Sequence, residues 1–94
     1  MSIMVVLQFS IAHQNLVKLA RSNPAILRPI LDLFEKHGRV SHRAAAGDQF
    51  FIDVDEWPSR EVYEDFKREA GPYIDAFEEA LGCRATEAVY DRVE

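Results

Sequence analysis

The spacing of hydrophobic residues changes several times along the chain, and each change predicts a new element. Residues 3–9 (IMVVLQF) are large and apolar apart from Gln8, a pattern typical of a strand that is buried on most of both faces. In residues 13–37 the apolar side chains instead recur at helical spacing, in two groups. This spacing predicts two helical segments.

The junction between the two helical segments has the sequence SNP at residues 22–24. Asn is a good helix cap and Pro suits the first helical position, so the second segment is predicted to begin at Pro24. Pro29 argues for a start at Arg28 instead, because a proline inside a helix deletes a backbone hydrogen bond. Gly38 is a typical helix stop and is predicted to end the segment.

Two strands joined by a tight turn are predicted next. Residues 39–46 alternate in character as a half-buried strand does, although their three alanines have poor strand propensity. Gly47 and Asp48 are typical of a hairpin turn. Residues 50–57 (FFIDVDEW) then return as a second strand.

Alternation divides residues 50–57 into two faces with different chemistry. Phe50, Ile52 and Val54 form a uniformly apolar face, which we expect to meet the helices. The opposite face combines aromatic rings with two carboxylates and is formed by Phe51, Asp53, Asp55 and Trp57. We expect this mixed face to meet a partner or a cavity.

A long amphipathic helix is predicted after Pro58. Ser59 is a good cap, and an apolar stripe follows it at helical spacing. The stripe consists of Val62, Phe66, Ala70, Ile74, Phe77 and Leu81. Gly71 and Pro72 are predicted to bend the helix so that it stays on the sheet. Gly82 is predicted to end it, and residues 84–93 alternate well enough to form a closing strand.

The resulting order, βαββαβ, predicts a ferredoxin-like α+β fold, in which an antiparallel four-stranded sheet carries both helices on one face. We interpret residues 1–94 as a single domain. The opposite face of the sheet would expose too much apolar surface for a monomer in water. We therefore expect a homodimer in which two sheets pack face to face, with Phe51, Asp53 and Trp57 in the dimer interface.

Composition narrows the classes of function. The chain has 94 residues and a net charge of -5, and its eleven basic residues are scattered, which disfavours nucleic acid as a partner. No apolar run approaches the roughly 20 residues that cross a bilayer. Cys83 is the only cysteine, so a disulfide within the chain and a cysteine metal cage are excluded. We expect a cytoplasmic protein that does not bind membranes.

The stretch from Asp55 to Ser59, in which Trp57 precedes a Pro-Ser corner, is followed by Tyr63 and Phe66 on the predicted helix. Together with the order of elements, this stretch resembles the dimeric α+β barrel superfamily, in particular small proteins related to the antibiotic biosynthesis monooxygenases. Members include cofactor-independent oxygenases of aromatic polyketide-like substrates, haem-degrading enzymes, lactone isomerases and proteins with no known activity. The resemblance implies a homodimer with a pocket in each subunit between sheet and helices.

Departures from the family pattern select among these branches. The haem-degrading branch has Trp at the position of Phe66 and a haem-ligating His at the position of Ala76, so the resemblance does not extend to haem degradation. The polyketide oxygenase branch surrounds a substrate phenol with Asn, Trp, Tyr and Arg. Trp57 matches that Trp, whereas no Asn is equivalent and Gln8 is only a loose substitute.

The candidate catalytic residues are His42, Gln8 and Tyr73. The pKa of a histidine lies near the value that proton abstraction from a phenol requires, so His42 is the candidate base, although strand histidines are more often structural. Gln8 and Tyr73 would orient the substrate. The candidate ligand-binding residues are Trp57, Phe66 and Tyr63, and each of these aromatics also suits pure packing.

Asp53 and Asp55 could hold a cation, but further oxygen ligands are not evident, so we predict no metal site. Pairing of the two carboxylates with Arg39, Arg43 or Arg84 is the favoured alternative.

Two hypotheses for function follow. The first is a cofactor-free, monooxygenase-like oxidoreductase that acts on or binds a hydrophobic aromatic molecule, such as a polyketide or quinol. The second is a non-catalytic barrel dimer that serves as a metabolite-binding or accessory protein. A ferredoxin-like domain that binds nucleic acid is disfavoured, because Asp53 and Asp55 would repel phosphates.

Overall fold

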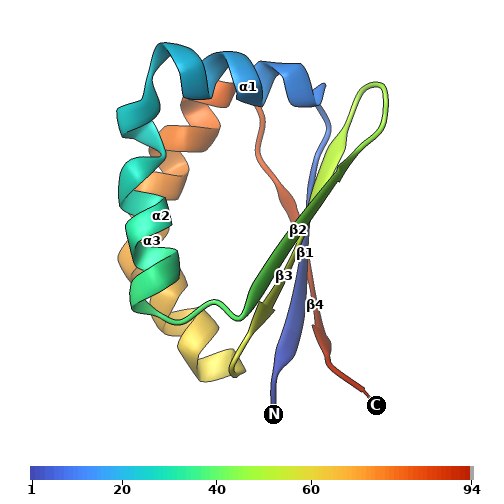
Figure 1. The fold of residues 1–94 in the computed structure, drawn as a ribbon, viewed down its shortest axis with the longest axis vertical. Helices are drawn as coiled ribbons and strands as arrows, with labels where there is room; N and C mark the ends of the chain where they lie inside the picture. The colour runs from blue at the N-terminus through green and yellow to red at the C-terminus, as the bar shows by residue number, and fades with distance from the viewer. Residues whose placement is uncertain (94) are drawn as a thin grey trace.

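The computed structural model describes residues 1–93 and contains one antiparallel four-stranded sheet with all helices on one side (Figure 1). The elements in chain order are β1 (Ile3–Phe9), α1 (His13–Ser22), the 3₁₀ turn η1 (Pro24–Ile26), α2 (Arg28–Lys36), β2 (Ser41–Ala46), β3 (Phe51–Trp57), α3 (Arg60–Leu81) and β4 (Thr86–Asp91). The predicted ferredoxin-like fold is confirmed, with its first helical segment divided into α1, η1 and α2.

The strands are ordered β2-β3-β1-β4 across the sheet, and every neighbouring pair is antiparallel. In the central row His42 lies opposite Asp55, Asp55 opposite Val5, and Val5 opposite Val89. Since side chains alternate between the faces of a sheet, this register places the odd-numbered residues of β1, β3 and β4 on one face.

The face of β3 that meets the helices is the opposite of the predicted one. Phe51 and Trp57 are 1% and 0% exposed in the single subunit, and Asp53 and Asp55 lie on the same side. The prediction that Phe51, Asp53 and Trp57 form a sheet-to-sheet dimer interface is therefore wrong. The expectation that this mixed face meets a cavity is correct, as described below.

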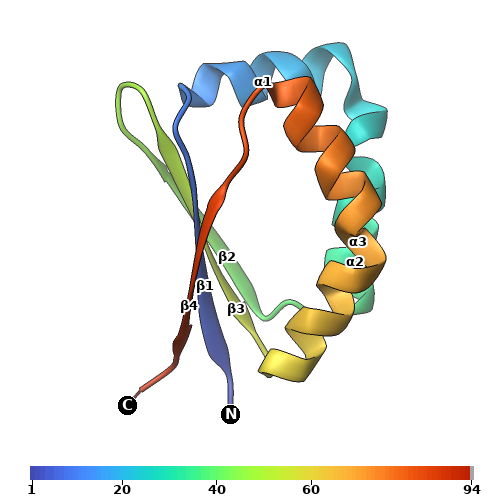
Figure 2. The ribbon, with the colours of Figure 1, turned by 180° about the vertical axis from the view of Figure 1, so that it is seen from behind.

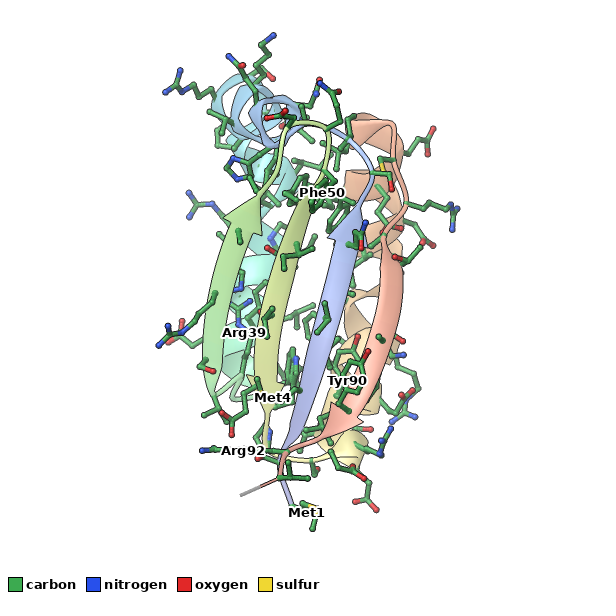
Figure 3. The ribbon with its side chains drawn as sticks, turned by 90° about the vertical axis from the view of Figure 1, so that its right-hand side faces the viewer. Met1, Met4, Arg39, Phe50, Tyr90 and Arg92 are labelled. Carbon is green, nitrogen blue, oxygen red and sulfur yellow. The ribbon has the colours of Figure 1, made fainter. Side chains whose placement is uncertain are left out.

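The other face of the sheet is left open by the helices, and Figure 3 views the molecule from this side. Val6 and Val54 are register partners at its centre and are half-buried, whereas Phe50 and Tyr90 are exposed near its ends. The open face also includes Met4, Gln8, Arg43, Ile52 and Ala88. Its centre is apolar, so it is an unpartnered hydrophobic surface in one subunit.

The helical segment after β1 turns twice because of its prolines. Pro24 opens the 3₁₀ turn η1, and Pro29 lies in the first turn of α2, where its missing N–H removes no helical hydrogen bond. Of the two predicted starts for the second helix, Arg28 is the correct one. Gly38 follows the end of α2 with φ of 72°, a conformation that glycine adopts easily.

Helix α3 begins and ends as predicted. The Ser59 side chain accepts a hydrogen bond from the Val62 N–H at 3.1 Å, and Gly82 adopts the left-handed conformation at φ of 80°. Gly71 and Pro72, where a bend is predicted, do not interrupt the helix, since α3 continues through Pro72. Figure 2 shows α3 bowed away from the middle of the sheet.

Two groups of aromatic side chains join the helices to the ends of the sheet. Near the start of α3 the rings of Trp57 and Phe66 have centroids 4.6 Å apart, and Phe34 of α2 stacks on Phe66 at 5.0 Å. At the other end Phe9 stacks on Phe51 at 4.7 Å and meets the edge of Phe77. The large rings hold the helical layer apart from the middle of the sheet. No helix within residues 1–93 is long and apolar enough to span a membrane.

Candidate functional site

A cavity of about 400 Å³ lies between the sheet and the helices. Its lining extends across the full width of the sheet, from His42 and Ala44 of β2 to Glu87 of β4. The remaining wall is formed by all three α-helices. Most of the lining is aliphatic or aromatic. Two groups of polar side chains lie near β2 and near β4, and His13 of α1 and Glu78 of α3 complete the polar part of the lining. Such a cavity, apolar with a few convergent polar groups, is typical of a small-molecule site.

The polar group near β2 is centred on Asp55. This carboxylate is only 4% exposed, and its two oxygens meet two different side chains. Oδ1 lies 2.6 Å from Nδ1 of His42, and Oδ2 lies 3.5 Å from Nη1 of Arg39. The Arg39 guanidinium also stacks over the Phe34 ring at 3.7 Å. The predicted pairing of a β3 carboxylate with Arg39 is therefore confirmed for Asp55.

The contact between His42 and Asp55 fixes the tautomer of the imidazole. An ionised carboxylate can only accept hydrogen bonds, so Nδ1 of His42 must carry the proton. Nε2 is then the nitrogen left with a lone pair. His42 lines the cavity and its side chain is 40% exposed, so it is accessible to a bound molecule. This arrangement makes His42 a candidate general base.

Asp53 lies two residues before Asp55 on the same face and also lines the cavity. Its carboxyl has no hydrogen-bond or ion-pair partner among the described residues. Burial raises the pKa of Asp53, and the negative charge of Asp55 adds to this rise, while His42 opposes it. Asp53 is thus a cavity carboxyl that is more easily protonated than a surface aspartate.

The polar group near β4 consists of Tyr63, Lys67 and Glu87. The Tyr63 hydroxyl is buried and donates a hydrogen bond to Oε2 of Glu87. Lys67 lies one turn further along α3, with Nζ 3.3 Å from Oε1 of Glu87 and 4.8 Å from the centre of the Tyr63 ring. Burial raises the pKa of Tyr63 strongly, with Glu87 adding to the effect, so the phenol remains a donor.

The cavity contains four of the predicted site residues. His42, Trp57, Tyr63 and Phe66 all line it. The indole N–H of Trp57 is buried without a hydrogen-bond partner within residues 1–93. An unsatisfied buried donor is costly and rare, which singles Trp57 out among the aromatic residues.

Two predicted residues lie outside the cavity. Gln8 is on the open face of the sheet, because its even position on β1 points it away from the helices. Tyr73 is 46% exposed on the outer side of α3. The prediction that Gln8 and Tyr73 orient a substrate in this cavity is therefore wrong.

Sequence reasoning missed Lys67 and Glu87. Lys67 follows Tyr63 at a spacing of four, which places the two side chains on neighbouring turns of one helix face. Ala88 of β4 lies on the open face of the sheet, and side chains alternate along a strand. The neighbouring Glu87 therefore lies on the helix side. No group of three or more ligating side chains that could hold a metal ion occurs in residues 1–93.

No protein-family model matches this sequence, and no curated protein matches it. Solved structures match it over nearly its whole length. A dimeric ferredoxin-like protein from an uncultured marine organism has a TM-score of 0.74 at 13% identity and covers 99% of this chain and 89% of its own. SnoaB, a cofactor-independent oxygenase from Streptomyces nogalater, has a TM-score of 0.67 at 13% identity, with 99% and 94% covered.

A putative antibiotic biosynthesis monooxygenase from Deinococcus radiodurans has a TM-score of 0.66 at 14% identity and covers 100% of this chain and 94% of its own. The chain has the fold of the dimeric α+β barrel proteins. In this fold the cavity described above lies between the sheet and the helical layer of one subunit. At such low identity the likeness establishes the fold, so the chemistry must come from the residues of this chain.

Proposed function

We propose that this protein is a homodimeric, cofactor-independent oxygenase that oxidises a hydrophobic aromatic molecule in the cavity beneath its helices. The substrate class is an electron-rich phenol or its keto form, such as an anthrone. The observation that carries the proposal is the 2.6 Å contact between His42 and buried Asp55, which leaves one imidazole nitrogen of His42 free as a base in an apolar cavity.

The first step is proton transfer from the substrate to His42. Nε2 removes the enol or phenol proton, and the positive charge that forms on the imidazole is stabilised by Asp55. Burial of the carboxylate beside His42 makes this stabilisation stronger than it would be in water. Arg39 holds the other oxygen of Asp55, so the carboxylate keeps its orientation.

The second step needs only dioxygen as a co-reactant. The anion transfers one electron to dioxygen, and the resulting carbon radical and superoxide combine at the carbon that carried two hydrogens. The peroxide takes up a proton and loses water, which leaves a carbonyl. Overall a CH₂ group and O₂ become a C=O group and H₂O, so four electrons leave the carbon and four enter the oxygen atoms.

The apolar wall would hold the flat ring system of the substrate. Trp57 and Phe66 lie together at one end of the cavity, and Phe34 of α2 stacks on Phe66 from the helical side. Aromatic side chains favour stacked or edge contacts with other aromatic rings. A planar apolar ring is therefore the ligand shape that this wall suits best.

Dimerisation is part of the proposal, since the open face of the sheet has an apolar centre around Val6 and Val54. Packing two such faces together would remove that surface from water, and a symmetric dimer uses the same patch on both subunits. The matched marine protein is dimeric by its description, which supports the same assembly here.

Oxidation of anthrone to anthraquinone tests the catalytic proposal, with the quinone followed by its absorbance in air-saturated buffer. We expect kcat/KM of His42→Gln to be about 100-fold lower than that of the wild type, within the usual range for a general base. His13→Gln is the matched control, because His13 also lines the cavity but contacts the edge of Phe51 and no carboxylate.

Wild-type protein that produces no quinone above the buffer rate would refute the oxygenase. The same is true of a His42→Gln variant as fast as the wild type. Tight binding of anthrone without turnover would instead support the alternative, a barrel that binds a metabolite.

A further inference from the structure

The polar group near β4 has hydrogen-bonding capacity that the protein does not use. The Lys67 ammonium has three donors and meets two carboxylates, Glu64 at 3.4 Å and Glu87 at 3.3 Å. The Glu87 carboxylate has about four acceptor sites and accepts from Tyr63 and Lys67. One donor of Lys67 and acceptor sites of Glu87 have no partner among the described residues. The two side chains are 33% and 35% exposed, so these groups can bind water or a molecule in the cavity.

This group lies across the sheet from the candidate base. Glu87 is the register partner of Leu7, Leu7 of Asp53, and Asp53 of Ala44, which is two residues from His42. Neighbouring strands lie about 4.8 Å apart, so the backbones of β2 and β4 are about 14 Å apart across this row. Between β2 and β4 the sheet contributes Asp53 of β3, on the His42 side, and the aliphatic side chains of Val5 and Leu7 on β1.

The sheet wall of the cavity thus carries polar side chains on β2, β3 and β4 and aliphatic side chains on β1. We propose that Lys67 and Glu87 form a second binding subsite, which recognises a hydroxyl or carbonyl group at the end of the ligand opposite the one that meets His42. This inference rests on the proposed function for the position of the ligand, and it adds a preference: a flat aromatic with hydrogen-bonding groups at both ends binds more tightly than one with a single such group.

The two polar groups favour a flat ligand that carries oxygen atoms at opposite ends. Two fused aromatic rings can carry oxygen atoms in this way. A carboxylate at the Glu87 end would be disfavoured by like-charge repulsion.

Anaerobic titration with two probes tests the subsite without any turnover. The probes are 2,6-dihydroxynaphthalene and 2-naphthol, which share one ring system and differ by the second hydroxyl. We expect wild-type protein to bind the diol at least tenfold more tightly, in keeping with a hydrogen bond to a charged group. The symmetry of the diol alone would give a factor of about two, because it can bind in two orientations.

The variants Lys67→Met and Glu87→Gln are expected to lower that preference to about twofold while leaving the affinity for 2-naphthol within about threefold. The retained affinity for 2-naphthol shows in the same titration that the cavity is intact. Glu64→Gln is the matched control, since Glu64 contacts Lys67 from outside the cavity lining and is expected to leave the preference unchanged.

A twofold preference in the wild type would overturn the subsite. So would a tenfold preference that survives in both variants. These outcomes are separate from the test of catalysis: anthrone turnover with no diol preference leaves the oxygenase and removes the subsite. A diol preference that depends on Lys67 and Glu87, without turnover, leaves the subsite and removes the oxygenase.

Discussion

His42 and Asp55 are register partners across β2 and β3, and their side chains meet on the helix side with 2.6 Å between Nδ1 and Oδ1. The pairing comes directly from the antiparallel register, because residues opposite each other have side chains on the same face. Asp53 lies on that face too but has no partner among the residues that the structure describes. Two aspartates, two positions apart, thus have opposite electrostatic surroundings.

Neutralising these two aspartates should therefore have different effects on stability. Asp55→Asn weakens the contacts to His42 and Arg39 and is expected to lower the free energy of unfolding by about 2 kcal/mol. Asp53→Asn removes a desolvated carboxyl and is expected to leave stability within about 0.5 kcal/mol or to raise it. Urea denaturation at pH 7 measures both, and equal losses for the two variants would contradict the different surroundings.

The effect of Asp53 should depend on pH. Burial raises its pKa in the folded chain above the unfolded value of 3.8, so the folded state holds this proton more tightly. The contribution of Asp53 to the free energy of unfolding is fully present below pH 3.8. It is lost as pH rises through the pKa of Asp53 in the folded chain. The advantage of Asp53→Asn over the wild type should accordingly grow with pH from about 3.8 upward. Unfolding curves of both proteins at several pH values measure it, and a constant difference would contradict it.

The sequence patterns predict the helices and strands, but they do not show which face of the sheet meets the helices. Both faces of β3 are rich in apolar residues, so alternation separated Phe51 and Trp57 from Ile52 and Val54 without showing which pair meets the helices. The uniformly apolar face was assigned to the helices, whereas the structure leaves that face open. The large ring of Trp57 and the paired carboxylate of Asp55 line the cavity beneath the helical layer.

The candidate site residues were likewise predictable only in part. His42, Trp57, Tyr63 and Phe66 were predictable because their residue types suit a cavity and their elements were placed correctly. The prediction for Gln8 is wrong because a strand that is apolar on both faces does not show which face meets the helices. Pairwise contacts such as that of Lys67 with Glu87 depend on how α3 packs against β4. No local sequence pattern contains this information.

Gly71 inside α3 and Gly82 at its C-cap offer a matched test of the observed path of the helix. At Gly71, inside the continuous helix, an added Cβ would meet no atom within 4 Å apart from its chain neighbours and the local helix backbone. Gly71→Ala should therefore stabilise the protein by about 0.5–1 kcal/mol, because alanine loses less conformational entropy on folding. Gly82→Ala should destabilise it by about 1 kcal/mol, since φ there is +80°.

Thermal unfolding distinguishes these glycine variants. A loss of stability in Gly71→Ala would contradict an ordinary helical conformation at residue 71.

The open face of the sheet provides the test of dimerisation. Val6 is half-buried at its centre, opposite Val54, and its side chain points away from the helices. In the proposed dimer Val6→Asp would bury an unpaired charge, which costs about 4 kcal/mol and corresponds to a roughly thousandfold weaker dimer. The subunit itself should keep its fold, because Val6 does not contribute to the core beneath the helices.

Sedimentation and circular dichroism together measure this effect. Wild-type protein is expected to sediment as a dimer at micromolar concentration, Val6→Asp as a folded monomer, and the surface control Gln14→Asp as a dimer. Phe51→Asp is expected to unfold the chain instead, since Phe51 is 1% exposed in the single subunit. A wild-type monomer, or a Val6→Asp variant that stays dimeric, would show that the open face is not where two subunits meet.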